Sequence, residues 1–112
     1  MLNKNTTARR RVIYFSRQSM PESEMWTVYI LKCFDGTFYT GITKNLSRRI
    51  HEHNNTKKGA KYTRSRRPVS LAASTVVNSM SEALKLESKV KKQKRNQKIS
   101  FLLEYKQNVE RI

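Results

Sequence analysis

The sequence contains few of the residues that build cross-linked, fibrous or membrane-spanning proteins. A single cysteine excludes an internal disulfide and a cysteine-based metal site, and three glycines and two prolines in 112 residues are too few for a collagen-like or low-complexity chain. No apolar run approaches the roughly 18 residues that a transmembrane helix needs. The early run at Val12–Phe15 is shorter than the roughly 7–15 residues of a signal-peptide core. We therefore expect a cytoplasmic or nuclear protein that is not secreted and has no membrane partner.

Acidic residues are scarce as well. Eight Asp and Glu face twenty-four Lys and Arg, which gives a formal net charge of +16 at pH 7. An excess of this size attracts polyanions, above all nucleic acid. We therefore expect DNA as a partner, with RNA as the alternative. A protein partner in addition to the nucleic acid is a separate hypothesis. Charge alone does not indicate whether the nucleic acid is cut.

The length and composition predict one domain preceded by a basic arm. With 112 residues and 37% hydrophobic content, the chain has room for one modest core. Residues 1–24 are basic and show little apolar periodicity, which predicts an arm that is mostly disordered, with at most a short ordered piece at Val12–Phe15. We place the domain at residues 25–106 and a C-terminal tail at residues 107–112.

Strand signals come first within this domain. Residues 26–33 and 38–42 are rich in β-branched and aromatic residues, and Asp35-Gly36 between them is a typical tight-turn dipeptide. The pattern predicts an antiparallel hairpin. Residues 69–77 are apolar and β-branched enough to predict a third strand.

Helix signals follow the hairpin and the third strand. Asn45 is a typical N-cap for a helix that we expect to end where a polar, basic loop begins, at residues 54–68. Ser79 and Glu82 form a capping box for a second helix, which we expect to end near Arg95. An amphipathic helix then closes the domain. The order β-β-α-β-α-α predicts an α+β fold with a three-stranded antiparallel sheet flanked by helices.

Four residues on the hairpin and the first helix are candidate site residues. Tyr29 and Tyr39 lie on neighbouring strands, where side chains on one face are about 5 Å apart when opposite and about 7–8 Å apart when diagonal. Their hydroxyls could converge, although tyrosines in strands more often serve packing. Arg49 and His53 are four residues apart and share one helical face. Arg49 could bind two phosphate oxygens, and an ordinary solvated arginine is the alternative.

Glu87 is the acidic residue with the most informative position. It stands four residues after Ala83 and three before Val90, on or beside the face of the second helix that should be buried. Burying an ionised carboxylate is costly unless something pairs with it. The partner is either a nearby Lys or Arg, or a metal such as Mg²⁺, which uses one or two protein carboxylates beside water and phosphate oxygens.

Two clusters of mainly basic residues surround these candidates, and we expect them to contact nucleic-acid phosphates. The first lies in the loop before the third strand and comprises Lys57, Lys58, Lys61, Tyr62, Arg64, Arg66 and Arg67. The second follows Glu87 and comprises Lys91, Lys92, Lys94 and Arg95. Tyr62 could stack on an unpaired base or pack against the helix.

At these positions the sequence resembles the GIY-YIG nuclease family. Residues 28–30 (Val-Tyr-Ile) and 39–41 (Tyr-Thr-Gly) are similar to the two halves of the motif that names the family. Residues 41–53 resemble the family's helix, which carries an arginine and then a histidine or tyrosine. Residues 59–64 and 67–69 resemble the small stand-alone, YhbQ-like members.

The resemblance implies a GIY-YIG-like fold and a DNA endonuclease that hydrolyses phosphodiester bonds with one divalent metal, Mg²⁺ or Mn²⁺. It assigns Tyr29 and Tyr39 to activating or orienting the attacking water, with His53 assisting them. Arg49 would stabilise charge on the transition state, and Glu87 would hold the metal. A tyrosine with a pKa of about 10 is a poor base at neutral pH, so the metal and cationic neighbours should lower that pKa.

The resemblance covers about residues 26–103 and has two departures. The first motif reads Val-Tyr-Ile in place of Gly-Ile-Tyr and keeps the tyrosine, and Ile99 stands where many family nucleases carry an asparagine. Structure-selective cleavage is a weaker expectation, because so small a domain has few side chains left to read a base sequence. The alternatives are a non-catalytic nucleic-acid-binding module and a nuclease subunit that requires a partner protein.

The basic clusters generate a prediction about salt. Each neutralised phosphate releases counterions, so the affinity for DNA should fall roughly 1000-fold or more between about 50 and 200 mM salt if several phosphates are contacted. Fluorescence anisotropy with a labelled duplex measures this dependence. An affinity that hardly changes over the range would exclude the basic clusters as the DNA-binding surface.

Overall fold

The computed structural model describes the backbone of residues 24–111 and the side chains of residues 24–105. The predicted basic arm, apart from its last residue, lies outside this range. In chain order the described elements are β2 (Trp26–Lys32), β3 (Phe38–Thr43), α2 (Leu46–Asn55), α3 (Lys61–Arg64), β4 (Ser70–Val77), α4 (Met80–Lys91), the 3₁₀ helix η2 (Arg95–Gln97) and α5 (Lys98–Arg111). None of the helices in this range is long and apolar enough to cross a bilayer.

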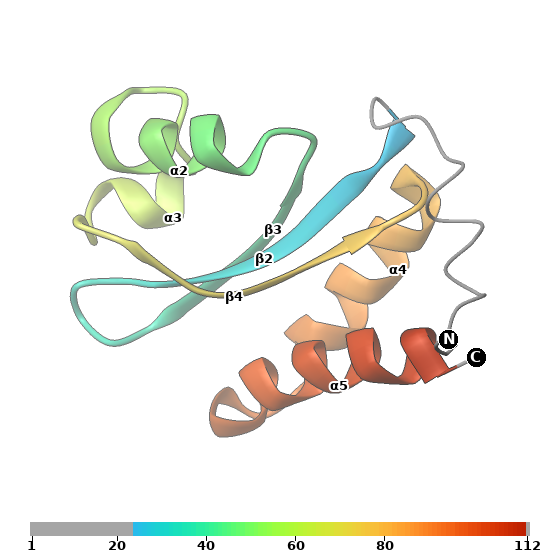
Figure 1. Cartoon of the computed structure of the whole chain (residues 1–112). Coiled ribbons are helices and arrows are strands. Elements are labelled where there is room, and N and C mark those ends of the chain that lie inside the picture. Colours follow the sequence, from blue (N-terminus) through green and yellow to red (C-terminus); the bar gives the residue numbers. More distant parts are fainter. Residues whose placement is uncertain (1–23, 112) are drawn as a thin grey trace.

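The three strands form one antiparallel sheet in the order β3-β2-β4. The central strand β2 reaches β3 through a tight turn, where Gly36 takes a φ of +84°, which L side chains rarely adopt. Helices α4 and α5 cover one face of the sheet, and α2 and α3 lie over the other face near the hairpin turn (Figure 1). The predicted α+β fold with a three-stranded antiparallel sheet flanked by helices is confirmed.

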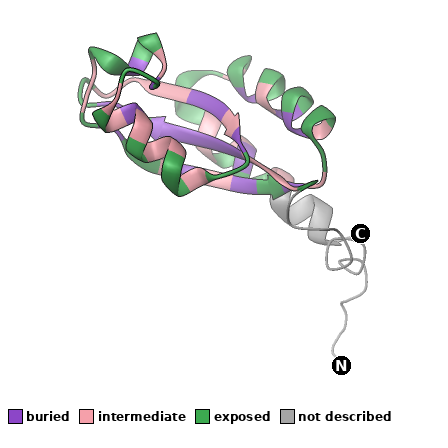
Figure 2. Cartoon of the chain, turned by 90° about the horizontal axis from the view of Figure 1, so that it is seen from above, coloured by how far each residue is buried: buried purple, intermediate pink, exposed green. Residues whose placement is uncertain are grey.

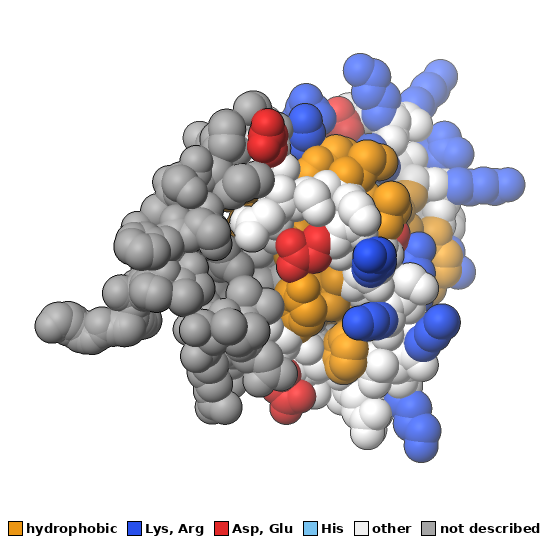
Figure 3. Space-filling view, turned by 90° about the vertical axis from the view of Figure 1, so that its right-hand side faces the viewer, with side chains coloured by type: hydrophobic (Ala, Val, Ile, Leu, Met, Phe, Trp, Pro, Cys, Tyr) orange, Lys and Arg blue, Asp and Glu red, His pale blue; other side chains and the backbone are white. Residues whose placement is uncertain are grey.

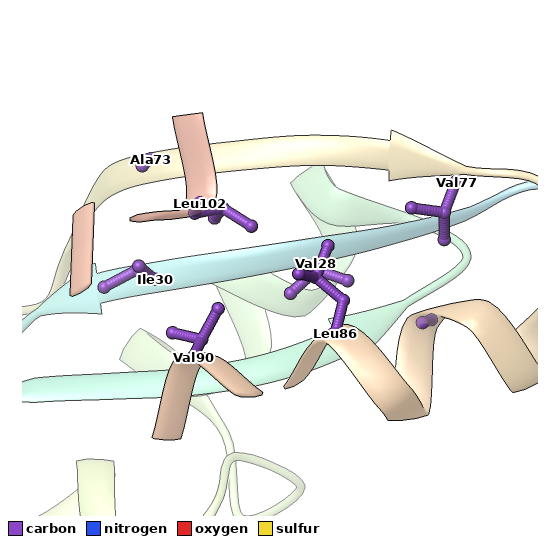
Figure 4. Close-up of a cluster of buried hydrophobic side chains, with 8 residues drawn as sticks. Val28, Ile30, Ala73, Val77, Leu86, Val90 and Leu102 are labelled. Carbon is purple, nitrogen blue, oxygen red and sulfur yellow. The ribbon is translucent and has the colours of Figure 1, made fainter. Parts of the chain in front are cut away.

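The larger part of the core lies between the sheet and the pair of helices α4 and α5. Val28 and Ile30 of β2 are fully buried. They lie against Leu86 and Val90 of α4 and Leu102 of α5 (Figure 4). Residues two apart in a strand, like residues four apart in a helix, share one face. The alternation in β2 therefore sends the next side chains of this strand to the opposite face.

That opposite face belongs to a second, smaller cluster. Tyr29 and Leu31 are at most 1% exposed, and they pack with Leu46 and Ile50 of α2. Cys33 joins this cluster as a small buried residue, although it follows the end of β2 instead of lying within the strand. Figure 2 shows that β2 is buried over most of its length. The candidate catalytic residue Tyr29 is thus also part of the core.

Both predicted helix caps are confirmed. The side chain of Asn45 accepts a hydrogen bond from the Arg48 N–H at 3.0 Å, and the hydroxyl of Ser79 accepts one from the Glu82 N–H at 3.1 Å. These bonds satisfy main-chain donors that have no partner inside the helix. The loop predicted at residues 54–68 is irregular only in part, because it contains the short helix α3.

One helix end differs from the prediction. Helix α4 ends at Lys91 and not near Arg95. The ammonium of Lys98 donates to the carbonyls of Val90 at 3.1 Å and Lys91 at 3.0 Å, which satisfies the end of the helix from outside. Helix α5 continues to Arg111.

The core generates a prediction about stability. Leu86→Ala should lower the free energy of unfolding by about 2–5 kcal/mol, because it removes a buried side chain and leaves a cavity. Leu84 is on the same helix but 46% exposed, so Leu84→Ala should change the free energy of unfolding by only about 0.5 kcal/mol. Urea unfolding measures both. Equal losses in the two variants would contradict the described packing of α4.

Candidate functional site

Two tyrosines of the hairpin form the centre of the site. Tyr29 on β2 is paired with Gly41 on β3, and Tyr39 lies two residues before that glycine, on the same face. The two ring centroids are 6.4 Å apart, as expected for diagonal neighbours. A Cβ at Gly41 would lie 2.6 Å from the Tyr29 hydroxyl oxygen and 3.1 Å from Cε2 of Tyr39. The Tyr29 ring can therefore cross β3 only over a glycine.

His53 of α2 completes an aromatic cluster with these two rings. Its Nε2 lies 2.8 Å from the Tyr29 hydroxyl oxygen, and its ring centroid is 5.1 Å from that of Tyr39. The imidazole is fully buried. The fold thus brings together three of the predicted site residues, and two of them, Tyr29 and His53, are 24 positions apart in the sequence.

Helix α3 and the turn before it hold the other nitrogen of His53. The main-chain N–H of Ala60 donates to Nδ1 at 3.3 Å, and the Thr63 hydroxyl lies 3.0 Å from Nδ1 and 2.9 Å from the Ala60 carbonyl. Because a fixed N–H points at Nδ1, we assign the proton of the neutral ring to Nε2, which then donates to Tyr29. Sequence reasoning missed Ala60 and Thr63, since nothing local marks a threonine in a basic loop as buried.

Arg49 lies one helical turn before His53 and borders the same cluster. Its guanidinium donates to the Glu52 carboxylate at 2.9 Å and to the Lys58 carbonyl at 2.8 Å. It also interacts with the Tyr29 hydroxyl. Glu52 therefore positions Arg49, and this ion pair holds the pKa of Glu52 below its usual value. Sequence reasoning missed Glu52, although its spacing of three residues from Arg49 in a helix was an available signal.

Glu87 of α4 also affects the Tyr29 hydroxyl, although it lies much later in the sequence. Its negative charge raises the pKa of Tyr29, and its carboxylate lies 3.3 Å from the ammonium of Lys91, one turn later. A lysine partner was one of the two alternatives that the sequence left open. Among the residues with described side chains, no three His, Cys, Asp or Glu gather as a metal site. A partly exposed single carboxylate fits a hard cation whose other ligands are water and phosphate oxygens.

Comparison with known proteins identifies the family. Residues 25–100 match the family model described as the GIY-YIG catalytic domain. This chain belongs to the GIY-YIG family. A UPF0213 protein of Syntrophus aciditrophicus (strain SB) is 51% identical over 85 residues, which cover 76% of this chain and 94% of that protein. A UPF0213 protein of Desulfotalea psychrophila is 55% identical over 73 residues, which cover 63% of this chain and 66% of that protein.

A solved structure supports the GIY-YIG fold of this chain. The solution NMR structure of a protein from E. faecalis matches with a TM-score of 0.53 and 42% sequence identity, over 73% of this chain and 86% of that chain. The predicted resemblance to small stand-alone members of the GIY-YIG family is therefore confirmed.

Burial governs the protonation of the GIY-YIG tyrosine and its histidine partner. It raises the pKa of Tyr29 to about 12, and the neighbouring Tyr39 adds to the increase. Arg49 lowers this pKa, as expected of a cationic neighbour, but burial outweighs it. Burial also lowers the pKa of His53 to about 4, with Arg49 acting in the same direction. Both groups are therefore uncharged at neutral pH.

Three of the arginines that we predicted to bind nucleic acid make contacts within the protein. Arg66 donates to the Asp35 carboxylate at 3.0 Å. Arg95 donates to a carbonyl of the hairpin turn. Arg67 donates to three main-chain carbonyls near the C-terminal end of α2. Their hydrogen bonds connect the hairpin turn and helix α2 to segments that come later in the sequence.

The other predicted basic residues leave their side chains exposed. They are Lys57, Lys58, Lys61, Arg64, Lys91, Lys92 and Lys94. Figure 3 shows Lys and Arg side chains projecting from the rim of the visible face, with few acidic side chains among them. Tyr62, in the middle of the first cluster, is 38% exposed. Exposed cationic groups of this kind can contact phosphates, and among them the ammonium of Lys91 is already paired with Glu87.

The lowered pKa of His53 predicts how stability depends on pH. In the unfolded chain the imidazole should titrate near its ordinary value of 6.5, whereas in the folded protein it stays neutral down to about pH 4. The unfolded state then binds more protons between these values, so the free energy of unfolding should fall as the pH decreases through this interval. Urea unfolding at several pH values measures the slope.

A variant isolates the contribution of this residue. His53→Gln should be less stable than the parent at pH 7, yet lose less stability between pH 6.5 and 4, because the titrating group is gone. An NMR titration of the His53 ring in the parent protein checks the same pKa directly. Protonation of this ring near its ordinary value would contradict the buried, neutral form.

Proposed function

We propose that this chain is a metal-dependent DNA endonuclease that hydrolyses phosphodiester bonds. One observation carries the proposal: the Tyr29 hydroxyl lies 2.8 Å from Nε2 of His53, and Arg49 and Glu87 both act on its pKa, in opposite directions. Membership of a family defined by a catalytic domain supports it. The net charge of +16 also suits a polyanionic substrate.

In this proposal Tyr29 and Tyr39 orient the attacking water, and Tyr29 accepts its proton after releasing its own phenolic proton to solvent. The N–H of His53 that donates to the Tyr29 oxygen favours the deprotonated phenol, because hydrogen bonds to a charged group stabilise it. Burial opposes this proton transfer, so Tyr29 requires additional positive charge when substrate is bound. A divalent cation held by Glu87, water and phosphate oxygens would supply that charge and reduce the repulsion between the phosphate and its nucleophile.

Arg49 would bind the phosphate oxygens on which charge develops. Its guanidinium is fixed by Glu52 and by the Lys58 carbonyl before substrate arrives, so little reorganisation is needed during the reaction. The exposed lysines would contact neighbouring phosphates without reading sequence. Few side chains near the site are left to read base edges, so a preference for irregular DNA structure suits the site better than a sequence preference.

A non-catalytic nucleic-acid-binding module, or a subunit activated by a partner protein, is the second candidate. The observation that favours it is the ion pair between Glu87 and Lys91, at 3.3 Å, which occupies the carboxylate proposed for the metal. Phosphate binding could draw the Lys91 ammonium away from Glu87. Otherwise a partner would have to separate this pair before a metal could bind.

The variant Glu87→Gln tests the endonuclease proposal. It keeps the shape of the side chain and removes the charge that would hold the metal. With Mg²⁺ or Mn²⁺, the wild-type protein should cleave supercoiled, linear, flap or four-way-junction DNA, and the variant should be slower by about 100-fold or more. Anisotropy measurements without divalent metal should show that the variant still binds DNA. Glu104→Gln, on an exposed part of α5, is the matched control and should cleave normally.

Arg49→Ala provides a second variant in the same assay. It should lose cleavage to a similar extent while its affinity for DNA changes little, because one charge among many contacts is removed. Wild-type turnover by Arg49→Ala would contradict the assignment. Binding without cleavage by the wild-type protein, on every substrate and with either metal, would favour the second candidate.

A further inference from the structure

A pocket lies beside the proposed active site and shares Tyr39 with it. It measures about 270 Å³ and opens at β3, which is an edge strand of the sheet within residues 24–111. Among the residues with described side chains, its lining is aromatic, hydroxylic and basic, without an acidic residue: Phe38, Tyr39, Thr40, Tyr62, Lys91 and Lys98. Because Tyr39 also contacts His53, the pocket adjoins the residues to which we assign catalysis.

Tyr62 forms a wall of this pocket and is held in place by its neighbours. The guanidinium carbon of Arg66 lies 3.9 Å from the centre of the Tyr62 ring. Arg66 is itself fixed by the Asp35 carboxylate at 3.0 Å and by the Tyr62 carbonyl at 2.9 Å. Tyr62 is nevertheless 38% exposed. A side chain that is exposed yet already ordered loses little conformational entropy when a ligand stacks on it.

The rest of the pocket indicates the chemistry of its ligand. The rings of Tyr39 and Tyr62 are inclined by only 26°, with centroids 6.2 Å apart, so a flat aromatic ligand would meet flat surfaces. The ammonium of Lys91 lines the same pocket, and its side chain is 57% exposed. A nucleotide combines a flat aromatic base with an anionic phosphate, and bases stack on exposed aromatic side chains in proteins that bind single strands.

We propose that this pocket binds an unpaired nucleobase of the DNA substrate, stacked on Tyr62, with the adjacent phosphate bound by Lys91. Among the described strands, none pairs with the outer edge of β3, so its main chain offers hydrogen-bonding groups to the base. The inference rests on the proposed endonuclease function and narrows its substrate class. A base inside a duplex is stacked on both sides and must be unpaired before it can enter a protein pocket. The substrate is therefore a single strand, or a duplex with an unpaired nucleotide beside the cleaved bond.

The test measures binding by the full chain in EDTA, so that it does not depend on cleavage. The probes are a single strand, the matched duplex and the same duplex with a one-nucleotide bulge, each carrying 2-aminopurine at the same position. The fluorescence of 2-aminopurine falls when this base stacks on an aromatic ring. Tyr62→Ala should weaken binding of the single strand and the bulge about 10-fold, leave duplex binding close to that of the parent, and abolish the quenching. Tyr62→Phe should retain both affinity and quenching.

Two further variants make the result decisive. Lys61→Ala removes an exposed charge from the same short helix and should weaken binding of all three probes by a similar factor. Tyr62→Leu keeps an apolar side chain at the position and should still lose the quenching, which separates stacking from any effect on folding. If Tyr62→Ala behaves like Lys61→Ala, or if the parent does not quench 2-aminopurine, the pocket does not bind a base. Failure of the proposed cleavage would leave this binding result unaffected.

Discussion

A hydrogen bond of 2.8 Å between the Tyr29 hydroxyl and Nε2 of His53 joins the central strand to α2 inside the protein. Both side chains are at most 1% exposed, so a broken bond would leave two polar groups buried without partners, which costs more than the bond itself contributes. The bond requires Gly41 beneath the Tyr29 ring. On the other side it requires α3, because Ala60 and Thr63 orient the imidazole. The hairpin, α2 and α3 are thereby held around one point.

The basic residues of the chain fall into two groups that composition cannot separate: those bonded within the protein and those exposed to solvent. Arg66, Arg67 and Arg95 donate to carbonyl or carboxylate oxygens within the protein, whereas the lysines of the same clusters are exposed. The division follows from chemistry. A planar guanidinium has five donors and can bridge several oxygens at once, while an ammonium is compact and strongly hydrated. The exposed basic surface is consequently smaller than the net charge suggests, and lysine supplies most of it.

The parts of the fold that were predictable depend on neighbours in sequence. The hairpin, the caps at Asn45 and Ser79 and the apolar face of α4 each rest on residues within a few positions of one another. The prediction was wrong for the end of α4, because the group that closes this helix is the ammonium of Lys98, several residues later. Helix α3 was missed for a similar reason, since its threonine is buried where it contacts His53 of α2, a residue distant in sequence.

The candidate site also has features that could be predicted from the sequence and features that could not. The sequence by itself determined the fold class, and its resemblance to the GIY-YIG motif indicated the family. That resemblance, with alternation and helical spacing showing which side chains share a face, made Tyr29, Tyr39, Arg49, His53 and Glu87 candidates. Only the tertiary structure decided that burial raises the pKa of the tyrosine to about 12, that Lys91 pairs with Glu87, and that Arg66 holds an exposed aromatic ring over a pocket. Desolvation and pairing of charges depend on groups that are distant in sequence, and these groups meet only when the sheet and its helices pack together.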